Sequence, residues 1–171
     1  MKNIPEKVVN YNVYDGNEKL VGIAGAITLP NLEAMSETIS GAGILGEYDS
    51  VSPGHFGPTP IEIPFRLLYD SSFSLFVPGK KTLILRASQQ SYNVNAGKTE
   101  YRGLKITLKG APKGLNLGSL EVGKPTESTN SIELHYIKIE ENGNVLLELD
   151  KFNFIFAVNG VDVLKDIRSQ I

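Results

Sequence analysis

Two small groups of residues in this sequence have types and spacings that enzymes and binding proteins use. The run Gly41-Ala42-Gly43-Ile44-Leu45-Gly46 matches the G-x-G-x-x-G pattern of dinucleotide-binding loops. Glu133 and His135 alternate on a predicted strand, so a carboxylate and an imidazole share one face, as base catalysis can require. Each pattern works only in a particular structural setting, so the surrounding elements decide what it means.

The glycine run lacks the setting of a nucleotide site. A dinucleotide loop needs a buried strand before it and a helix after it, so that backbone N–H groups face the pyrophosphate. Residues 33–40 are largely polar, and Pro53-Gly54 would soon end any helix. We interpret 41–60 as a long loop instead. Its apolar content predicts that it docks on a partner; the apolar residues are Ile44, Leu45, Tyr48, Val51 and Phe56.

The Glu133 and His135 pair is interpreted as the polar face of a half-buried strand. No nucleophile or oxyanion donors accompany the pair in the sequence, and no H-E-x-x-H, G-x-S-x-G or phosphate-loop motif occurs. The only other histidine, His55, is far away in the chain, and the scattered carboxylates have no metal-ligand spacing. The sequence therefore predicts no enzyme, no cofactor and no metal site.

Composition limits the possible chemistry and fold, whereas the net charge does not identify a partner. The 17 Lys and Arg against 19 Asp and Glu give a net charge of −2, with no basic surplus for nucleic acid or an anionic membrane. No cysteine is present, which excludes disulfides and thiol chemistry. The 171 residues suit a single domain, 1–171. The 17 Gly and nine Pro interrupt the chain too often for long helices, so a mainly β fold is expected.

Alternating apolar and polar residues predict the strands that must position these groups. A first hairpin is expected, with arms at 8–14 and 18–29 around the turn Asp15-Gly16-Asn17. Glycines in its second arm indicate a bulge or a close neighbouring backbone. Further strands are predicted at 61–68, with Pro64 favouring a sheet edge, and at 81–92, 101–109 and 131–149, the last broken by a turn at 141–144.

The remaining segments are predicted to be loops and short helices. Residues 31–40 are expected to form a short irregular or helical piece, and long loops are expected at about 41–60 and 110–130. A short helix is predicted at 70–76 and a terminal helix at 161–168. The pattern of Phe152, Phe154 and Phe156 predicts one buried face of a strand.

Four features in this order resemble the major tail tube proteins of contractile-tailed bacteriophages and related R-type bacteriocins. They are Ile27-Thr28-Leu29-Pro30 after the first hairpin, Gly41-Ala42-Gly43 at the start of a long loop, the mid-chain helix, and Asn159-Gly160-Val161-Asp162 before the terminal helix. The resemblance implies an antiparallel β-sandwich or incomplete barrel with one short mid-chain helix and a C-terminal helix. It also implies that six copies close into a ring around a lumen, and that rings stack into a tube.

The resemblance carries expectations about partners and location. It implies a structural, non-enzymatic protein of a phage tail or phage-tail-like particle, assembled in the host cytoplasm. The implied partners are further copies of the chain, the tail sheath protein, and baseplate and tail terminator proteins, with DNA only as cargo in the lumen of a phage. No membrane binding is expected of the protein itself.

The residues themselves fit this resemblance without requiring it. Strand edges and apolar loops leave unmet pairing capacity, which a closed ring would satisfy. The loop at 41–60 is predicted to make the contact between stacked rings through Gly41, Gly43, Ile44, Leu45, Tyr48 and Phe56. Two alternatives remain open: a monomeric β-sandwich module that binds a ligand, and a small hydrolase that uses His135 with Glu133.

Overall fold

The computed structural model describes residues 3–171 and is built almost entirely of antiparallel strands. Two short helices, α1 (Asp70–Phe76) and α2 (Lys165–Arg168), complete it. The strands are β1 (Asn3–Asp15), β2 (Glu18–Leu20), β3 (Ala34–Ser40), β4 (Glu47–Phe56), β5 (Pro60–Phe65), β6 (Lys81–Asn93), β7 (Lys98–Asn116), β8 (Ser128–Glu141), β9 (Asn144–Asp150), β10 (Ile155–Val158) and β11 (Val161–Asp162).

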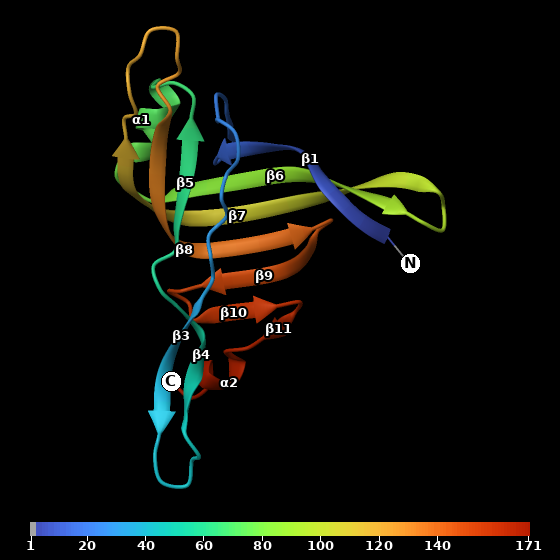
Figure 1. Cartoon of the computed structure of the whole chain (residues 1–171), viewed down its shortest axis with the longest axis vertical. Helices are drawn as coiled ribbons and strands as arrows, with labels where there is room; N and C mark the ends of the chain where they lie inside the picture. The colour runs from blue at the N-terminus through green and yellow to red at the C-terminus, as the bar shows by residue number, and fades with distance from the viewer. Residues whose placement is uncertain (1–2) are drawn as a thin grey trace.

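Nine of these strands form one open sheet in the order β11-β10-β9-β8-β7-β6-β1-β2, with β5 paired to β8 beside β9. The other two, β3 and β4, form a separate hairpin that projects from one end of the molecule (Figure 1). At the opposite end lie α1 and the 117–127 loop between β7 and β8 (Figure 1). The predicted fold class is confirmed: the protein is mainly β, its antiparallel sheet is not closed into a barrel, and a mid-chain and a C-terminal helix are present.

The large sheet follows from side-chain alternation. In β7, Ile106 and Leu108 are buried while their neighbours are half-buried, as expected for a strand with one face on the core. In β8 the buried residues pass from Leu134 to Ile137, a step of three, because a register shift opposite Lys109 leaves His135 without a partner in β7. The bulge therefore reverses which alternate side chains of β8 point toward the core.

Within residues 3–171, buried apolar side chains of the large sheet, β5 included, and of α1 form one cluster. Leu75 of α1 and Phe65 of β5 are fully buried in it. The sequence predicts a sheet edge at Pro64. In the structure β5 pairs with β8 along one side, and on its other side it makes only a short contact with residues 22–24. The helix predicted at 70–76 is present with these bounds.

The second arm of the first hairpin is shorter than predicted. The turn after Asp15 is confirmed, but β2 ends at Leu20 rather than at residue 29. Gly22 has a φ of +84°, and a Cβ there would lie 3.0 Å from the hydroxyl oxygen of Tyr69. The predicted close neighbouring backbone is confirmed, because the Gly22 carbonyl accepts a hydrogen bond from the Arg66 N–H and the Ala24 N–H donates to the Pro64 carbonyl, both at 2.9 Å.

The predictions for 31–40 and 41–60 are wrong. Residues 34–40 form β3 rather than an irregular or helical piece, and much of the predicted loop is β4. Both strands are largely exposed on both faces, so no alternation of apolar and polar residues reveals them. Pro53 and Gly54 are accommodated where the register shifts, between the pairs Ser36–Val51 and Ala34–Phe56.

The predicted loop at about 110–130 is also shorter than expected. Strand β7 continues to Asn116 and β8 begins at Ser128, so only 117–127 connects them. Pairing with β8 carries β7 past Gly110 and Pro112, through two register shifts. A neighbouring strand therefore overrides the local preference of glycine and proline for a loop.

Hydrogen bonds from the backbone to two aspartate side chains interrupt the strand and the helix predicted near the C-terminus. The carboxylate of Asp150 accepts hydrogen bonds from the backbone N–H groups of Phe152 and Asn153, which turns the chain, so the three phenylalanines do not share one strand face. Phe152 is 78% exposed, contrary to its predicted burial. Likewise Asp162 caps a turn at Leu164, so the predicted helix at 161–168 is reduced to α2.

Candidate assembly surfaces

The free end of the β3–β4 hairpin carries five of the six predicted contact residues. Residues 41–46 form its turn, in which the Ile44 N–H donates to the Gly41 carbonyl at 3.1 Å. The Leu45 side chain is fully exposed and Ile44 is 40% exposed. Tyr48 lies opposite Ile39 on one face of the hairpin, and both side chains reach solvent. The structure thus gathers Gly41, Gly43, Ile44, Leu45 and Tyr48 at one projecting tip.

Phe56, the sixth predicted contact residue, lies apart at the base of the hairpin. Its ring meets Phe156 of β10 edge-on, with the centroids 5.1 Å apart, and it packs against the hydrophobic core. The structure therefore assigns Phe56 a role inside its own subunit. A contact of Phe56 with a neighbouring ring stays a prediction.

The G-x-G-x-x-G run lies in the hairpin turn, between two exposed strands. The helix whose N–H groups would face a pyrophosphate does not follow it. The geometry gives these glycines a role in turning the chain, with φ of +90° at Gly43 and +88° at Gly46.

The base of the hairpin is fixed to the C-terminal part of the chain. A Cβ at Gly54, whose φ is +74°, would lie 2.7 Å from Leu164, so only glycine lets β4 approach this closely. Next to it, His55 packs edge-on against Phe154 at 5.7 Å. The hairpin is therefore an arm that is packed at its base and unsupported at its tip.

The arm is also acidic. No Lys or Arg occurs between Lys19 and Arg66. The hairpin strands carry three exposed carboxylates, Glu37, Glu47 and Asp49. Of these, Asp49 accepts a hydrogen bond from Thr38 across the hairpin at 2.7 Å. A partner surface for this arm is expected to be apolar at its centre and basic around it.

The long strand β1 offers a second surface. Its residues 13–15 pair with β2, whereas 3–12 pair with β6 alone among the described residues, so their outer edge is open. Ile4, Val8 and Val9 of this stretch are each about half exposed. An open edge with apolar side chains is suited to pair with a strand of another chain.

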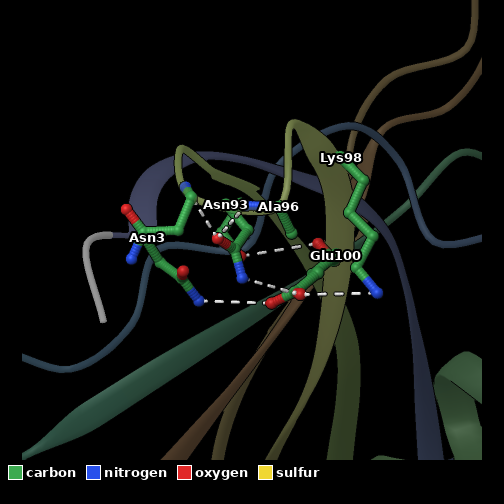
Figure 2. Close-up of polar contacts among 7 residues, drawn as sticks. Asn3, Asn93, Ala96, Lys98 and Glu100 are labelled. Carbon is green, nitrogen blue, oxygen red and sulfur yellow. Dashed lines mark hydrogen bonds and ion pairs between the residues drawn. The ribbon is translucent and has the colours of Figure 1, made fainter.

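A polar cluster holds the start of β1 against the far end of the β6–β7 hairpin (Figure 2). The Glu100 carboxylate accepts hydrogen bonds from the side-chain amides of Asn93, at 3.0 Å, and Asn3, at 3.3 Å. The Asn93 side-chain oxygen accepts from the backbone N–H groups of Asn95 and Ala96 and closes the turn. These bonds keep the β1 edge extended beyond the hydrophobic core.

His135 and Glu133 have separate partners. The His135 ring stacks on Phe152, with the centroids 4.5 Å apart. Burial lowers the pKa of His135, and the nearby charge of Lys80 adds to this effect. Glu133 instead accepts a hydrogen bond from the Thr59 backbone N–H and pairs with Lys113 at 3.5 Å. Glu133 thus serves to hold its neighbours in place rather than to orient the imidazole.

Across residues 3–171, no group of three or more His, Cys, Asp or Glu side chains is arranged to hold a metal ion. No helix in the described part of the chain is both long and apolar enough to cross a membrane. The surfaces that stand out are those suited to contact other proteins.

The fold is an open antiparallel sheet with a projecting hairpin. The chain belongs to the phage tail tube protein FII family, whose sequence model matches residues 5–171. The tail tube protein of Escherichia phage P2 is 27% identical over 177 aligned positions, which cover 98% of each chain. The resemblance seen in the sequence is therefore confirmed.

Two solved structures share the fold. A chain of the sheath/tube terminator of an extracellular contractile injection system, PVC, superposes with a TM-score of 0.57 at 12% identity, over 80% of this chain and 96% of that one. A chain of the PVC sheath-tube complex in the extended state also gives a TM-score of 0.57, at 14% identity, over 80% of this chain and 91% of that one. Tail tube proteins are components of phage tails or contractile injection particles, and this family is structural.

Proposed function

We propose that six copies of this chain close into a ring through their sheet edges, and that the rings stack into the inner tube of a contractile phage tail or phage-tail-like particle. The observation that carries the proposal is the open edge of β1 over residues 3–12. Within this stretch Ile4, Val8 and Val9 are exposed. Pairing this edge with a strand of the next copy removes it from solvent, and cyclic repetition of one such contact closes a ring.

Stacking of the rings is assigned to the β3–β4 tip. Ile44 and Leu45 contribute roughly 1.5–3 kcal/mol each when fully buried on a partner, and a six-fold ring repeats that contribution at every subunit. The remaining tip residues in this contact are Gly41, Gly43 and Tyr48. The single domain 1–171 then provides both the ring contact and the stacking contact.

The tube serves as a conduit for DNA or for ions. Basic residues of β7 are balanced by glutamates of β8, with Arg102 and Glu141 at 3.0 Å and Lys105 and Glu140 at 3.4 Å. Paired charges hold a passing phosphate backbone weakly, which favours transit. This role requires no cofactor and no catalysis.

The solved relatives support the choice of partners. Their structures are a sheath-tube complex and a sheath/tube terminator, so the proposed partners are the tail sheath protein and a terminator, together with a baseplate protein at the other end. DNA is a partner only as cargo. Assembly is proposed to take place in the host cytoplasm before the particle is released.

Sedimentation velocity from micromolar to near-millimolar protein, followed by negative-stain electron microscopy, tests the proposal. Rings and then tubes should grow with concentration, by mass action. Replacing Ile44 and Leu45 with Ser should leave rings but shorten or abolish tubes. A monomer that persists at every concentration, and whose melting temperature rises with a small ligand, would instead support a monomeric binding module.

A further inference from the structure

We propose that the β3–β4 tip docks into a groove beside α1 of a subunit in the next ring. The α1 groove is defined by Phe73, Phe76 and Val77 on one side and by Pro112 and Lys113 of β7 on the other, and has a volume of about 550 Å3. The inference rests on the proposed stacking of rings and identifies the surface that receives the tip.

The two surfaces lie at opposite ends of the molecule. In Figure 1 the longest dimension is vertical, with the β3–β4 tip at the bottom and α1 at the top. The tip of one subunit therefore cannot reach the groove of the same subunit. A contact between two different surfaces at opposite ends joins copies head to tail, and this arrangement builds an open-ended stack rather than a closed pair.

The groove has apolar side chains that its own subunit does not cover. In α1, Ser72 and Leu75 face inward and are fully buried, whereas Phe73 and Phe76, three residues apart, face outward. Phe73 is 49% exposed and Phe76 is 43% exposed, and the next residue, Val77, is 55% exposed. The exposed Ile44 and Leu45 at the arm tip have the matching apolar character.

Charge complementarity selects this partner. The arm carries Glu37, Glu47 and Asp49 and no lysine or arginine. Beside the groove, Gly79 is followed by Lys80 and Lys81, and Lys113 lies on the other wall. Lys113 pairs with Glu133, and the Lys81 amine donates to the Ser74 carbonyl at 2.9 Å. Lys80 is exposed and has no ion-pair partner within residues 3–171.

A charge-swap experiment tests the contact in the full-length protein. The arm variant Glu47→Lys with Asp49→Lys, and the groove variant Lys80→Glu with Lys113→Glu, should each form rings but no tubes. The four substitutions in one chain should restore tubes. The control Lys19→Glu with Lys165→Glu changes the net charge as much as the groove variant and should keep tubes of normal length.

A second variant keeps the test decisive if Lys113→Glu disturbs Glu133. Phe76→Ser removes an outward-facing ring without touching that ion pair, and circular dichroism reports whether its fold is intact. A folded Phe76→Ser variant that forms rings without tubes supports the groove. Normal tubes from it and from the groove charge variant would overturn the inference.

The outcomes separate this inference from the proposed function. If the wild-type protein forms neither rings nor tubes, the stacking proposal itself fails. If Ile44→Ser with Leu45→Ser abolishes tubes while the groove variants stack normally, stacking stands and the acceptor lies elsewhere. If the groove variants form normal tubes but no longer retain purified sheath protein, the groove belongs to the sheath, and the inference is wrong.

Discussion

The two projecting hairpins of this protein, β3–β4 and β6–β7, are stabilised in opposite ways. Strands β6 and β7 pair over thirteen residue positions, and their inner halves bury Leu83, Leu85, Ile106 and Leu108 in the core. Their outer end is held to β1 by the Asn93 and Glu100 cluster (Figure 2). No side chain of the β3–β4 hairpin is fully buried, and the hairpin is packed only at its base.

The difference is consistent with our proposal, in which the β6–β7 hairpin stabilises its own chain and the β3–β4 hairpin contacts another copy. An isolated two-stranded hairpin is marginally stable in water, so the exposed β3–β4 arm gains most from a surface that covers it. Its apolar residues would be a liability in a monomer and become useful in an assembly. Substitutions in the two hairpins are therefore expected to affect folding and assembly separately.

The largest effect is expected at Leu108 in β7. This side chain is fully buried, and Leu108→Ala should lower the free energy of unfolding by about 2–5 kcal/mol. The matched change in the other hairpin, Leu45→Ala, should alter it by no more than about 0.5 kcal/mol, because the side chain is fully exposed. Urea unfolding of the monomer measures both, and equal losses would show that the arm is part of the core.

A smaller loss is expected at the base of the arm. Gly54→Ala places a Cβ near Leu164 at a positive φ and should destabilise the protein by about 1–3 kcal/mol. Gly43→Ala in the turn also has a positive φ but meets nothing within 4 Å, so it should cost less. Thermal unfolding of the two variants compares them. A greater loss at Gly43 would show that the base is not the point of attachment.

The polar cluster of Figure 2 is expected to contribute less again. Glu100→Ala removes two hydrogen bonds to its carboxylate and should cost about 1 kcal/mol, with faster hydrogen exchange at the start of β1. Lys98→Ala removes only an exposed ion pair at 3.9 Å and should change little. Unchanged exchange in the Glu100 variant would mean that backbone pairing alone holds β1.

The smallest effect concerns acid conditions near the base of the arm. A hydrogen bond from Arg168 lowers the pKa of Asp162 from its ordinary 3.8. A lowered folded-state pKa stabilises the fold above the unfolded value, so this contribution should be lost as the pH falls below about 3.8 and through the folded-state pKa. Hydrogen exchange at α2 should rise there slightly. The Asp162→Asn variant should lack this pH dependence, and a wild-type response confined to higher pH would contradict the assignment.

The strands with one buried face could be predicted from the sequence. Alternation identified β6, β7, β8 and β9, and the segment that begins at Asp70 was identified as α1. The arm could not be found this way, because residues 34–40 and 47–56 are exposed on both faces and have no core to pattern them. The turn at Phe152 was missed for another reason, since the Asp150 cap competes locally with strand continuation.

The contact role of the 41–60 segment stays a prediction, but its placement can be compared with the structure. The sequence drew attention to 41–60 through its apolar residues, and the structure gathers five of the six chosen residues at one tip. The proposed acceptor groove beside α1 was not anticipated, although Phe73 and Phe76 at helical spacing were a visible signal. A spacing of three shows that two side chains share a helix face, but not whether that face points inward or outward.

The sequence by itself determined the mainly β character, the absence of cysteine chemistry, the short helix and the resemblance to tail tube proteins, because these depend on composition and on the local order of residues. Only the tertiary structure decided that 41–60 is half of a projecting arm, that Phe56 packs at its base, and that β1 has an open edge. These features depend on which distant segments pair and on which surfaces remain uncovered, and no local pattern encodes a neighbour that is far away in the chain.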